Sequence, residues 1–275
     1  MWNMKTAIYI GKREAVSDPC LQTLWDDLRA GGCELDFLAE GESPDEGHDM
    51  LLSVGGDGTF LSASMLVAGK DIPVMGVNLG RLGFLSENRP SAVASAILTG
   101  EYTVENRAML KADVHTGNPE LDEFPYALNE FTVHRSGAAM LGVEVSLDGV
   151  QLPTYWADGL IVSTSSGSTA YSLSAGGPIV LPESKVLIIS PIAPHNLNVR
   201  PLVVPDNTEI RLRMHSRDEN VIYTADNRTA VIPSDAEVGI SVAQFSLKRV
   251  RLNRSNFIDA LTEKLFWGED VRNIK

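Results

Sequence analysis

The feature that most constrains the fold of this 275-residue chain is an apolar strand that runs into a glycine-rich turn. Residues 51–54 read Leu-Leu-Ser-Val, and an apolar, helix-like stretch follows the turn. The turn consists of Gly55, Gly56, Asp57, Gly58 and Thr59. Glycines after a strand let backbone N–H groups approach an anion closely, and the next helix adds the positive end of its dipole. The pattern predicts a strand, a phosphate-binding turn and a helix.

Asp57 is unusual in such a turn, because a carboxylate repels phosphate unless it has a compensating role. It can hold a magnesium ion, or it can accept a proton from an attacking hydroxyl group. Either role indicates phosphoryl transfer. The alternative is that the turn is only a tight connection, since glycine after a strand is common.

Strands alternate with helices over the first 105 residues, and this pattern is typical of a parallel sheet in an α/β domain. Asp18 followed by Pro19 predicts a helix start, and Gly31 with Gly32 predicts its end. The predicted strands are Thr6–Ile10, Cys33–Leu38, 50–54 and Ile72–Val77, and the later helices are about 59–68 and Ser91–Leu98.

Residues 106–254 read instead as short strands separated by turn residues, and they predict a mostly β domain. Asp148-Gly149 is a strong hairpin signal. Residues 210–214 alternate apolar side chains with arginines, so one face of that strand should pack. Residues 255–275 are predicted to form a C-terminal helix that packs back on the first domain. The predicted strands are Met109–Val114, Ala127–His134 and Gly142–Leu147.

Composition limits the classes of partner. The chain contains 44% hydrophobic and 21% charged residues, and 23 basic against 36 acidic residues give a formal charge of −13. This balance argues against general binding to nucleic acid or to an anionic membrane. Two cysteines without metal-ligand spacing, no signal-peptide pattern and no long apolar run predict a cytoplasmic protein.

Two further segments are candidates for ligand contacts. Residues 78–85, with Gly80 and Gly83, follow the next strand at the same carboxyl edge of the sheet, where ligands of open α/β sheets bind. Asn129 and Glu130 interrupt a strand-like run although both are poor strand formers. The alternatives are turn geometry for the glycines and a bulge for Asn129-Glu130.

The most specific segment runs from Asp158 to Pro178. The strand Gly159–Ser163 leads into a loop rich in serine, threonine and glycine, whose donors suit the phosphates and riboses of a dinucleotide. Tyr171 offers an aromatic ring for stacking on adenine. The alternative is a solvated polar loop.

These motifs together resemble the NAD kinase family, of the superfamily that also contains diacylglycerol kinases and phosphofructokinases. The resemblance rests on Gly55–Gly58, Asn129-Glu130, the segment 158–178, and residues 191–195 with Arg200-Pro201 behind them. It covers most of the chain. It implies a two-domain NAD kinase-like fold, with a nucleotide-binding domain at 1–105 and an NAD-binding domain at 106–254.

The resemblance also implies roles for individual residues. Asp57 would be the general base on the 2′-hydroxyl of the adenosine ribose of NAD, which attacks the γ-phosphorus of ATP to give NADP. Magnesium would arrive with the nucleotide, and the enzyme would be a homodimer or homotetramer. Asn129 and Glu130 would hold ribose hydroxyls or adenine, and Asp158 would contact the nicotinamide side. The remaining substrate contacts would be Gly55, Gly56, Gly58, Thr59, Thr169, Ala170, Tyr171, Ser172, Leu173, Ser174 and Ala193.

Three places in the chain depart from the family pattern, and the first is Ser165-Ser166, where the family commonly carries Pro-Thr. Trp156 stands where many members carry a basic residue, and Asp226-Asn227-Arg228 replaces a pattern that often ends in Gln. A lipid or sugar kinase of the same superfamily is an alternative, and so is a sensor that binds NAD without phosphorylating it. The chain has neither a Walker motif nor a G-x-G-x-x-G fingerprint after its first strand, which argues against a dehydrogenase.

Overall fold

The computed structural model describes residues 4–12, 17–80, 83–253 and 256–266. The chain divides into two compact units, Met1–Asn106 with Leu247–Lys275 as unit 1 and Arg107–Ser246 as unit 2. The chain passes from one unit to the other within two long strands, β5 (Tyr102–Asp113) and β17 (Glu237–Leu252).

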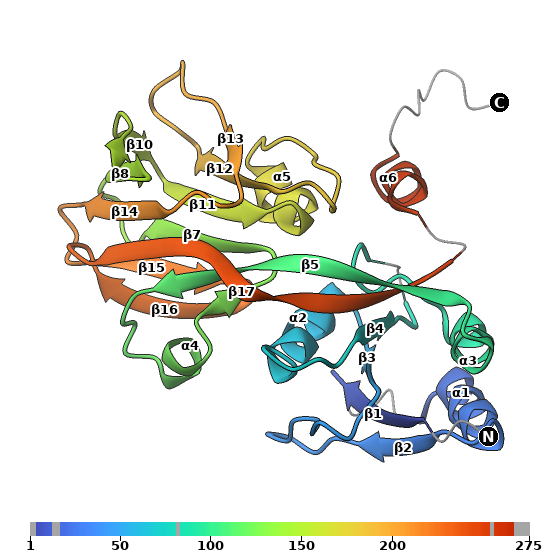
Figure 1. Cartoon of the computed structure of the whole chain (residues 1–275). Helices are drawn as coiled ribbons and strands as arrows, with labels where there is room; N and C mark the ends of the chain where they lie inside the picture. The colour runs from blue at the N-terminus through green and yellow to red at the C-terminus, as the bar shows by residue number, and fades with distance from the viewer. Residues whose placement is uncertain (1–3, 13–16, 81–82, 254–255, 267–275) are drawn as a thin grey trace. The chain divides into compact units, whose positions relative to one another are not determined.

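Unit 1 is built on a parallel sheet with the strand order β2-β1-β3-β4-β17 (Figure 1). Parallel neighbours need crossover connections, and a helix supplies one between β1 and β2 and another between β3 and β4. The other strands are β1 (Lys5–Ile10), β2 (Glu34–Phe37), β3 (Met50–Val54) and β4 (Val74–Val77). All residues of β3 and β4 are buried, as expected for strands covered on both faces.

Helices α1 (Pro19–Ala30) and α3 (Pro90–Thr99) pack on one face of this sheet, and α2 (Asp57–Leu66) contacts β3 and β4. The predicted start of α1 is confirmed, because Asp18 caps it by accepting a hydrogen bond from the Cys20 N–H at 2.8 Å. The helix α6 (Phe257–Leu265) belongs to the same unit. The remainder of the predicted C-terminal helix, residue 255 and residues 267–275, lies outside the described residues.

Unit 2 contains two antiparallel sheets. One has the order β10-β8-β14-β17, and the other has the order β13-β12-β11-β7-β15-β16. The strands are β6 (Tyr126–Ala127), β7 (Glu130–Arg135), β8 (Leu141–Leu147), β9 (Val150–Gln151), β10 (Tyr155–Ala157), β11 (Gly159–Thr164), β12 (Val186–Ile192), β13 (Leu202–Pro205), β14 (Ile210–His215), β15 (Asn220–Ala225) and β16 (Arg228–Pro233). Short helical segments are α4 (Pro119–Glu123), η2 (Ser166–Thr169) and α5 (Tyr171–Ser174).

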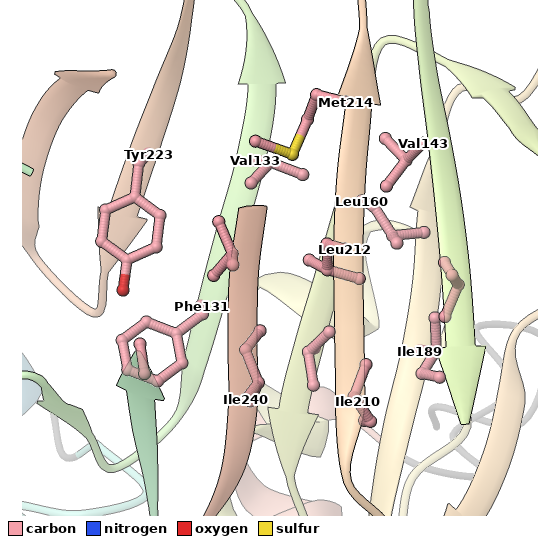
Figure 2. Packing of buried hydrophobic residues seen from close by; sticks show 14 of the residues in the cluster. Phe131, Val133, Val143, Leu160, Ile189, Ile210, Leu212, Met214, Tyr223 and Ile240 are labelled. Carbon is pink, nitrogen blue, oxygen red and sulfur yellow. The ribbon is translucent and has the colours of Figure 1, made fainter. Parts of the chain in front are cut away.

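The core of unit 2 is filled by side chains from both sheets (Figure 2). Leu212 of β14 and Ile240 of β17 contribute from one sheet, and Phe131 of β7 and Tyr223 of β15 contribute from the other. The rings of Phe131 and Tyr223 stack with their centroids 5.7 Å apart. This packing fixes β7 and β15, whose ends carry the polar residues described below.

Most sequence predictions of local structure are confirmed, including the α/β first part with a parallel sheet and the mostly β second part. Asp148 and Gly149 form the predicted hairpin with positive φ angles of 49° and 83°. Several boundaries were wrong: for example, α2 begins at Asp57, about two residues early, β4 begins at Val74 rather than Ile72, and β5 begins at Tyr102 rather than Met109. No helix in the described part is long and apolar enough to cross a membrane.

Candidate functional site

The glycine-rich turn connects β3 to α2 in unit 1. Gly55 has a φ of 152°, and a Cβ atom there would lie 2.3 Å from Oγ1 of Thr59, so only glycine fits. Gly56 is the N-cap of α2 and offers no side chain to cap it. Gly56 and Gly58 are exposed, and a Cβ at either would meet no described atom within 4 Å. Packing therefore does not require glycine at 56 and 58, and the absence of side chains there leaves room for an anion to approach the first N–H groups of α2.

Asp57 is the first residue of α2, and its carboxylate accepts hydrogen bonds from three consecutive backbone N–H groups. Phe84 donates to Oδ2 at 2.8 Å, while Leu85 and Ser86 donate to Oδ1 at 3.1 and 2.8 Å. Two donors occupy the acceptor positions of Oδ1, and one occupies Oδ2. Among the described residues Oδ2 therefore keeps one acceptor position for a ligand proton.

The second loop, residues 78–85, supplies two of these three donors, and its predicted place at the same carboxyl edge of the sheet as the glycine-rich turn is confirmed. Residues 81 and 82 of this loop lie outside the described residues. Gly83 is required by packing, because a Cβ there would lie 1.8 Å from Oδ1 of Asp57. The Ser86 hydroxyl donates to the carbonyl oxygen of Gly55 at 2.6 Å. The two loops are thus joined at two points.

In unit 2, Asn129 lies in a break between β6 and β7, and Glu130 is the first residue of β7. The break is held by Asp226, whose carboxylate accepts N–H groups from Leu128 at 2.8 Å, Asn129 at 2.8 Å and Glu130 at 3.1 Å. Asp226 occupies the hairpin between β15 and β16 with a φ of 51°. The predicted interruption of the strand is confirmed, and its cause is this aspartate.

Glu130 lies in surroundings that favour its neutral form. Its residue is 8% exposed, and burial, together with the charge of nearby Asp226, raises the pKa of Glu130 to about 8. The Tyr171 N–H donates to the Glu130 carboxyl group and acts in the opposite direction. Burial also raises the pKa of Asp226, although its three N–H donors and Arg228 oppose the shift. Because Asp226 has these donors, Glu130 is the member of the pair that carries the proton at neutral pH.

The serine- and threonine-rich segment was predicted to be a loop, but the structure shows two short helical turns, η2 and α5. Its hydroxyl groups mostly bond to the protein itself. Ser165 donates to Pro182 at 2.9 Å, Ser168 donates to Val180 at 3.1 Å, and the fully buried Ser172 bonds to Ser190. These internal hydrogen bonds hold the segment together.

The segment 164–171 lies directly against Asn129. The N–H of Thr164 donates to the Asn129 carbonyl oxygen at 2.9 Å. A Cβ at Gly167 would lie 2.2 Å from the same oxygen, so glycine is required for this approach. Tyr171 is 42% exposed, which leaves its ring accessible. Glu130 and Tyr171 are neighbours because the Tyr171 N–H bonds to the Glu130 carboxyl group, although the sequence places them 41 positions apart.

Asp158 lies between β10 and β11, and its carboxylate is paired with Arg135, whose Nε donates to Oδ1 at 2.7 Å. Its N–H donates to Ile192, the residue before the exposed Ala193. Ala193 has a φ of 44° at the end of β12. Trp156 covers Gly142, where a Cβ would lie 2.7 Å from the indole ring.

The predicted residues thus form one group around Asp57 in unit 1 and a second group around Glu130 in unit 2, with Asp158 and Ala193 together at the ends of β11 and β12. Sequence reasoning missed the N–H groups of residues 84–86 and the anchoring role of Asp226. Asp226 between two strand-like runs was the available signal, since aspartate is common in hairpin turns. Among the described residues, no group of three His, Cys, Asp or Glu side chains could hold a metal ion.

Comparisons with known proteins agree on one family. The family models described as ATP-NAD kinase N-terminal domain and ATP-NAD kinase C-terminal domain match residues 35–102 and 128–252. An NAD kinase of Flavobacterium psychrophilum is 44% identical over 233 residues, which cover 83% of this chain and 79% of the relative. An NAD kinase of Bacteroides fragilis is 42% identical over 228 residues, which cover 82% of this chain and 78% of the relative.

Two solved structures are similar to this fold. An NAD kinase from Archaeoglobus fulgidus in complex with ATP has a TM-score of 0.76 and 28% identity, and the match covers 94% of this chain and 98% of that chain. Yeast NADH kinase complexed with NADH has a TM-score of 0.83 and 21% identity, and the match covers 99% of this chain and 90% of that one. The second likeness concerns the fold alone.

Proposed function

This chain belongs to the NAD kinase family, and we propose that it transfers the γ-phosphoryl group of ATP to the 2′-hydroxyl of the adenosine ribose of NAD. The related enzyme from Archaeoglobus fulgidus binds ATP, which supports ATP as the donor. In this reaction the 2′-oxygen forms a bond to the γ-phosphorus, the bond from that phosphorus to the β,γ-bridging oxygen breaks, and ADP leaves. NADP is the product.

The observation that carries this proposal is the fixed carboxylate of Asp57 beside the exposed N–H groups at the start of α2. We assign Asp57 as the general base, which accepts the proton of the 2′-hydroxyl on Oδ2. A carboxylate is far less basic than an alkoxide, so it accepts the proton late, and positioning and charge neutralisation supply most of the acceleration. The N–H groups near Gly56 and Gly58 suit the transferring phosphate.

The NAD-binding residues are proposed in unit 2. Asn129 and Glu130 would bind ribose hydroxyls or adenine, and the exposed ring of Tyr171 would stack on adenine. Asp158, held by Arg135, would contact the nicotinamide side, near Ala193. Ser172 would support the site from behind, since its hydroxyl bonds to Ser190. The remaining proposed contacts are Gly55, Thr59, Thr169, Ala170, Leu173 and Ser174.

Three further features belong to the proposal. Magnesium would enter with ATP, as part of the substrate, and would supply neutralisation of the charge on the phosphates. The enzyme would act as a homodimer or homotetramer in the cytoplasm. Residues 1–105 would serve the nucleotide and residues 106–254 the NAD, with residues 255–275 packing on the first of these domains.

The experiment measures NADP formation from NAD, ATP and magnesium by the full chain and by Asp57→Asn. Asp45→Asn is the matched control, because Asp45 also holds a loop N–H in unit 1, that of Gly47 at 2.9 Å. We expect NADP from the wild type and the control, and a loss of turnover in Asp57→Asn. NAD binding without any NADP from the wild type would instead indicate an NAD sensor.

A further inference from the structure

The peptide groups of residues 83–86, called here the clamp loop, lie between a carboxylate and two cations. The N–H groups of residues 84–86 point to Asp57, as described above, and the carbonyl oxygens of residues 83–85 accept from the two cations. Lys264 of α6 donates from Nζ to the carbonyl oxygen of Gly83. Arg249 of β17 donates from one terminal nitrogen to Phe84 at 3.1 Å and to Leu85 at 3.4 Å.

Each of the three peptide units therefore joins a positive side chain to the same negative one. The unit between residues 83 and 84 connects Lys264 to Oδ2 of Asp57, and the next two units connect Arg249 to Oδ1. Hydrogen bonds in such chains polarise one another, and bonds to ionised groups are the stronger ones. The two cations consequently strengthen and orient the N–H donors that hold the carboxylate.

Lys264 is seated by its neighbours rather than extended into solvent. Nζ lies 4.7 Å from the centre of the Phe84 ring, and that ring also contacts Phe257, the first residue of α6, at 6.2 Å between centroids. Burial lowers the pKa of Lys264, whereas the charges of Glu87 and Asp57 act in the opposite direction. Both the aromatic ring and the carboxylates favour a cation at this point.

Arg249 is 4% exposed and holds its position through ion pairs. Its terminal nitrogens lie 2.8 Å from a carboxylate oxygen of Glu87 and 3.6 Å from one of Glu105. Its backbone pairs with Val74 of β4. A buried arginine with two acidic partners is a rigid donor, so its bonds to the clamp loop are fixed by the sheet itself.

We propose that Lys264 and Arg249 are positioning residues of the phosphoryl-transfer reaction, which hold Asp57 in place through the peptide units of the clamp loop. This inference rests on the proposed function. It assigns a role in the reaction to the C-terminal helix α6, which lies beyond the part of the chain matched by the family models. Neither residue touches the substrate in this role.

The test uses Lys264→Met and Lys264→Arg in the full chain, because Lys264 is only half-buried and its loss should leave the fold intact. Lys70→Met is the matched control, since Lys70 in the same unit also donates from Nζ to a carbonyl oxygen, that of Pro44 at 2.8 Å. The kcat and KM for NAD are measured with saturating ATP, and melting curves verify folding. Each Lys264 variant is also combined with Asp57→Asn.

We expect Lys264→Met to lower kcat roughly tenfold or more with little change in KM for NAD, because misplaced catalytic groups slow the chemical step. Lys264→Arg should recover most of kcat, and Lys70→Met should not change it. In the Asp57→Asn background Lys264→Met should have little further effect, since its role passes through Asp57.

An unchanged kcat in a folded Lys264→Met protein overturns the proposal. An equal fall in both Asp57 backgrounds also overturns it, because the lysine would then act independently of the carboxylate. Failure of the proposed function is a separate result: the wild type itself would form no NADP.

Discussion

Asp57 in unit 1 and Asp226 in unit 2 are held by the same pattern of hydrogen bonds. Each carboxylate accepts three consecutive backbone N–H groups, one on Oδ2 and two on Oδ1, from residues 84–86 in one case and 128–130 in the other. The donor distances range from 2.8 to 3.1 Å at both. The local geometry alone does not distinguish a catalytic group from a structural one.

The surroundings of the two carboxylates differ. Asp57 starts a helix beside the exposed Gly56 and Gly58, and two cations hold the far side of its donor loop. Asp226 lies in a hairpin where burial raises its pKa. Accessibility and the adjacent helix N-terminus support the role in catalysis that we propose for Asp57, whereas Asp226 is enclosed and holds a turn.

The largest expected effect is the loss of turnover in Asp57→Asn. We expect kcat to fall by about two to four orders of magnitude, the usual contribution of a positioned general base. Asp226→Asn is the matched variant, because it makes the same change in the same donor pattern. Steady-state kinetics at saturating NAD and ATP should show a much smaller fall in kcat for Asp226→Asn. Similar kcat values for the two variants would contradict the distinction between them.

The sequence predicted the group of residues around Asp57 and the group around Glu130 separately, because local sequence signals mark each group. Asp18-Pro19 and Asp148-Gly149 fix a helix start and a hairpin through short-range chemistry, and both appear where expected. Glycines and an aspartate after a buried strand likewise marked the turn at 55–59. Local conformational rules are enough for such features.

The partners of these groups were not predictable in the same way. The donors to Asp57 are backbone N–H groups 27 to 29 positions away, and every residue has a backbone N–H, so the sequence carries no mark of them. Lys264 lies 181 positions from its carbonyl partner. The polar segment after β11 was predicted to be a loop whose donors face a dinucleotide, but tertiary partners bind several of its hydroxyls and the segment forms helical turns.

The second prediction concerns stability, where the order of the two aspartates should reverse. Asp226→Asn replaces an acceptor oxygen by an amide that faces an N–H donor in an enclosed place, and it should lower the free energy of unfolding by about 2–3 kcal/mol. The same change at the half-buried Asp57 should cost less, because water can reach the donor that loses its partner. Denaturant unfolding measures both, and a larger loss at Asp57 would contradict the prediction.

The third prediction concerns NAD binding by Tyr171, whose N–H bonds to Glu130 in the segment that Asp226 holds. Tyr171→Ala should weaken NAD binding by roughly 1–3 kcal/mol if the exposed ring stacks on adenine, by analogy with base–aromatic stacking. Tyr171→Phe is the control, because it keeps the ring. Isothermal titration with NAD measures both affinities. An unchanged affinity in Tyr171→Ala would assign the ring no part in binding.

The last and smallest effect is a dependence of stability on pH that the buried carboxyl group of Glu130 should cause. Folding raises the pKa of Glu130 from 4.5 to about 8, so its stabilising contribution is complete below pH 4.5 and is lost as the pH rises through 8. Glu130→Gln keeps a neutral side chain at every pH. The melting temperature of the wild type should therefore fall relative to this variant between pH 6 and 9, by roughly 2–4 °C or more for each kcal/mol lost.

Glu237→Gln is the control for this measurement, because hydrogen bonds from Arg213 and Arg211 lower the pKa of Glu237. Its contribution is complete above its ordinary pKa, so its melting difference from the wild type should stay constant between pH 6 and 9. A constant difference for Glu130→Gln as well would mean that Glu130 is ionised throughout. Asp226 and Glu130 would then carry two adjacent negative charges, and the three N–H donors and Arg228 would have to compensate for both. The Asp226 site, like the Asp57 site, would then hold its carboxylate in the presence of positive side chains and not through enclosure alone.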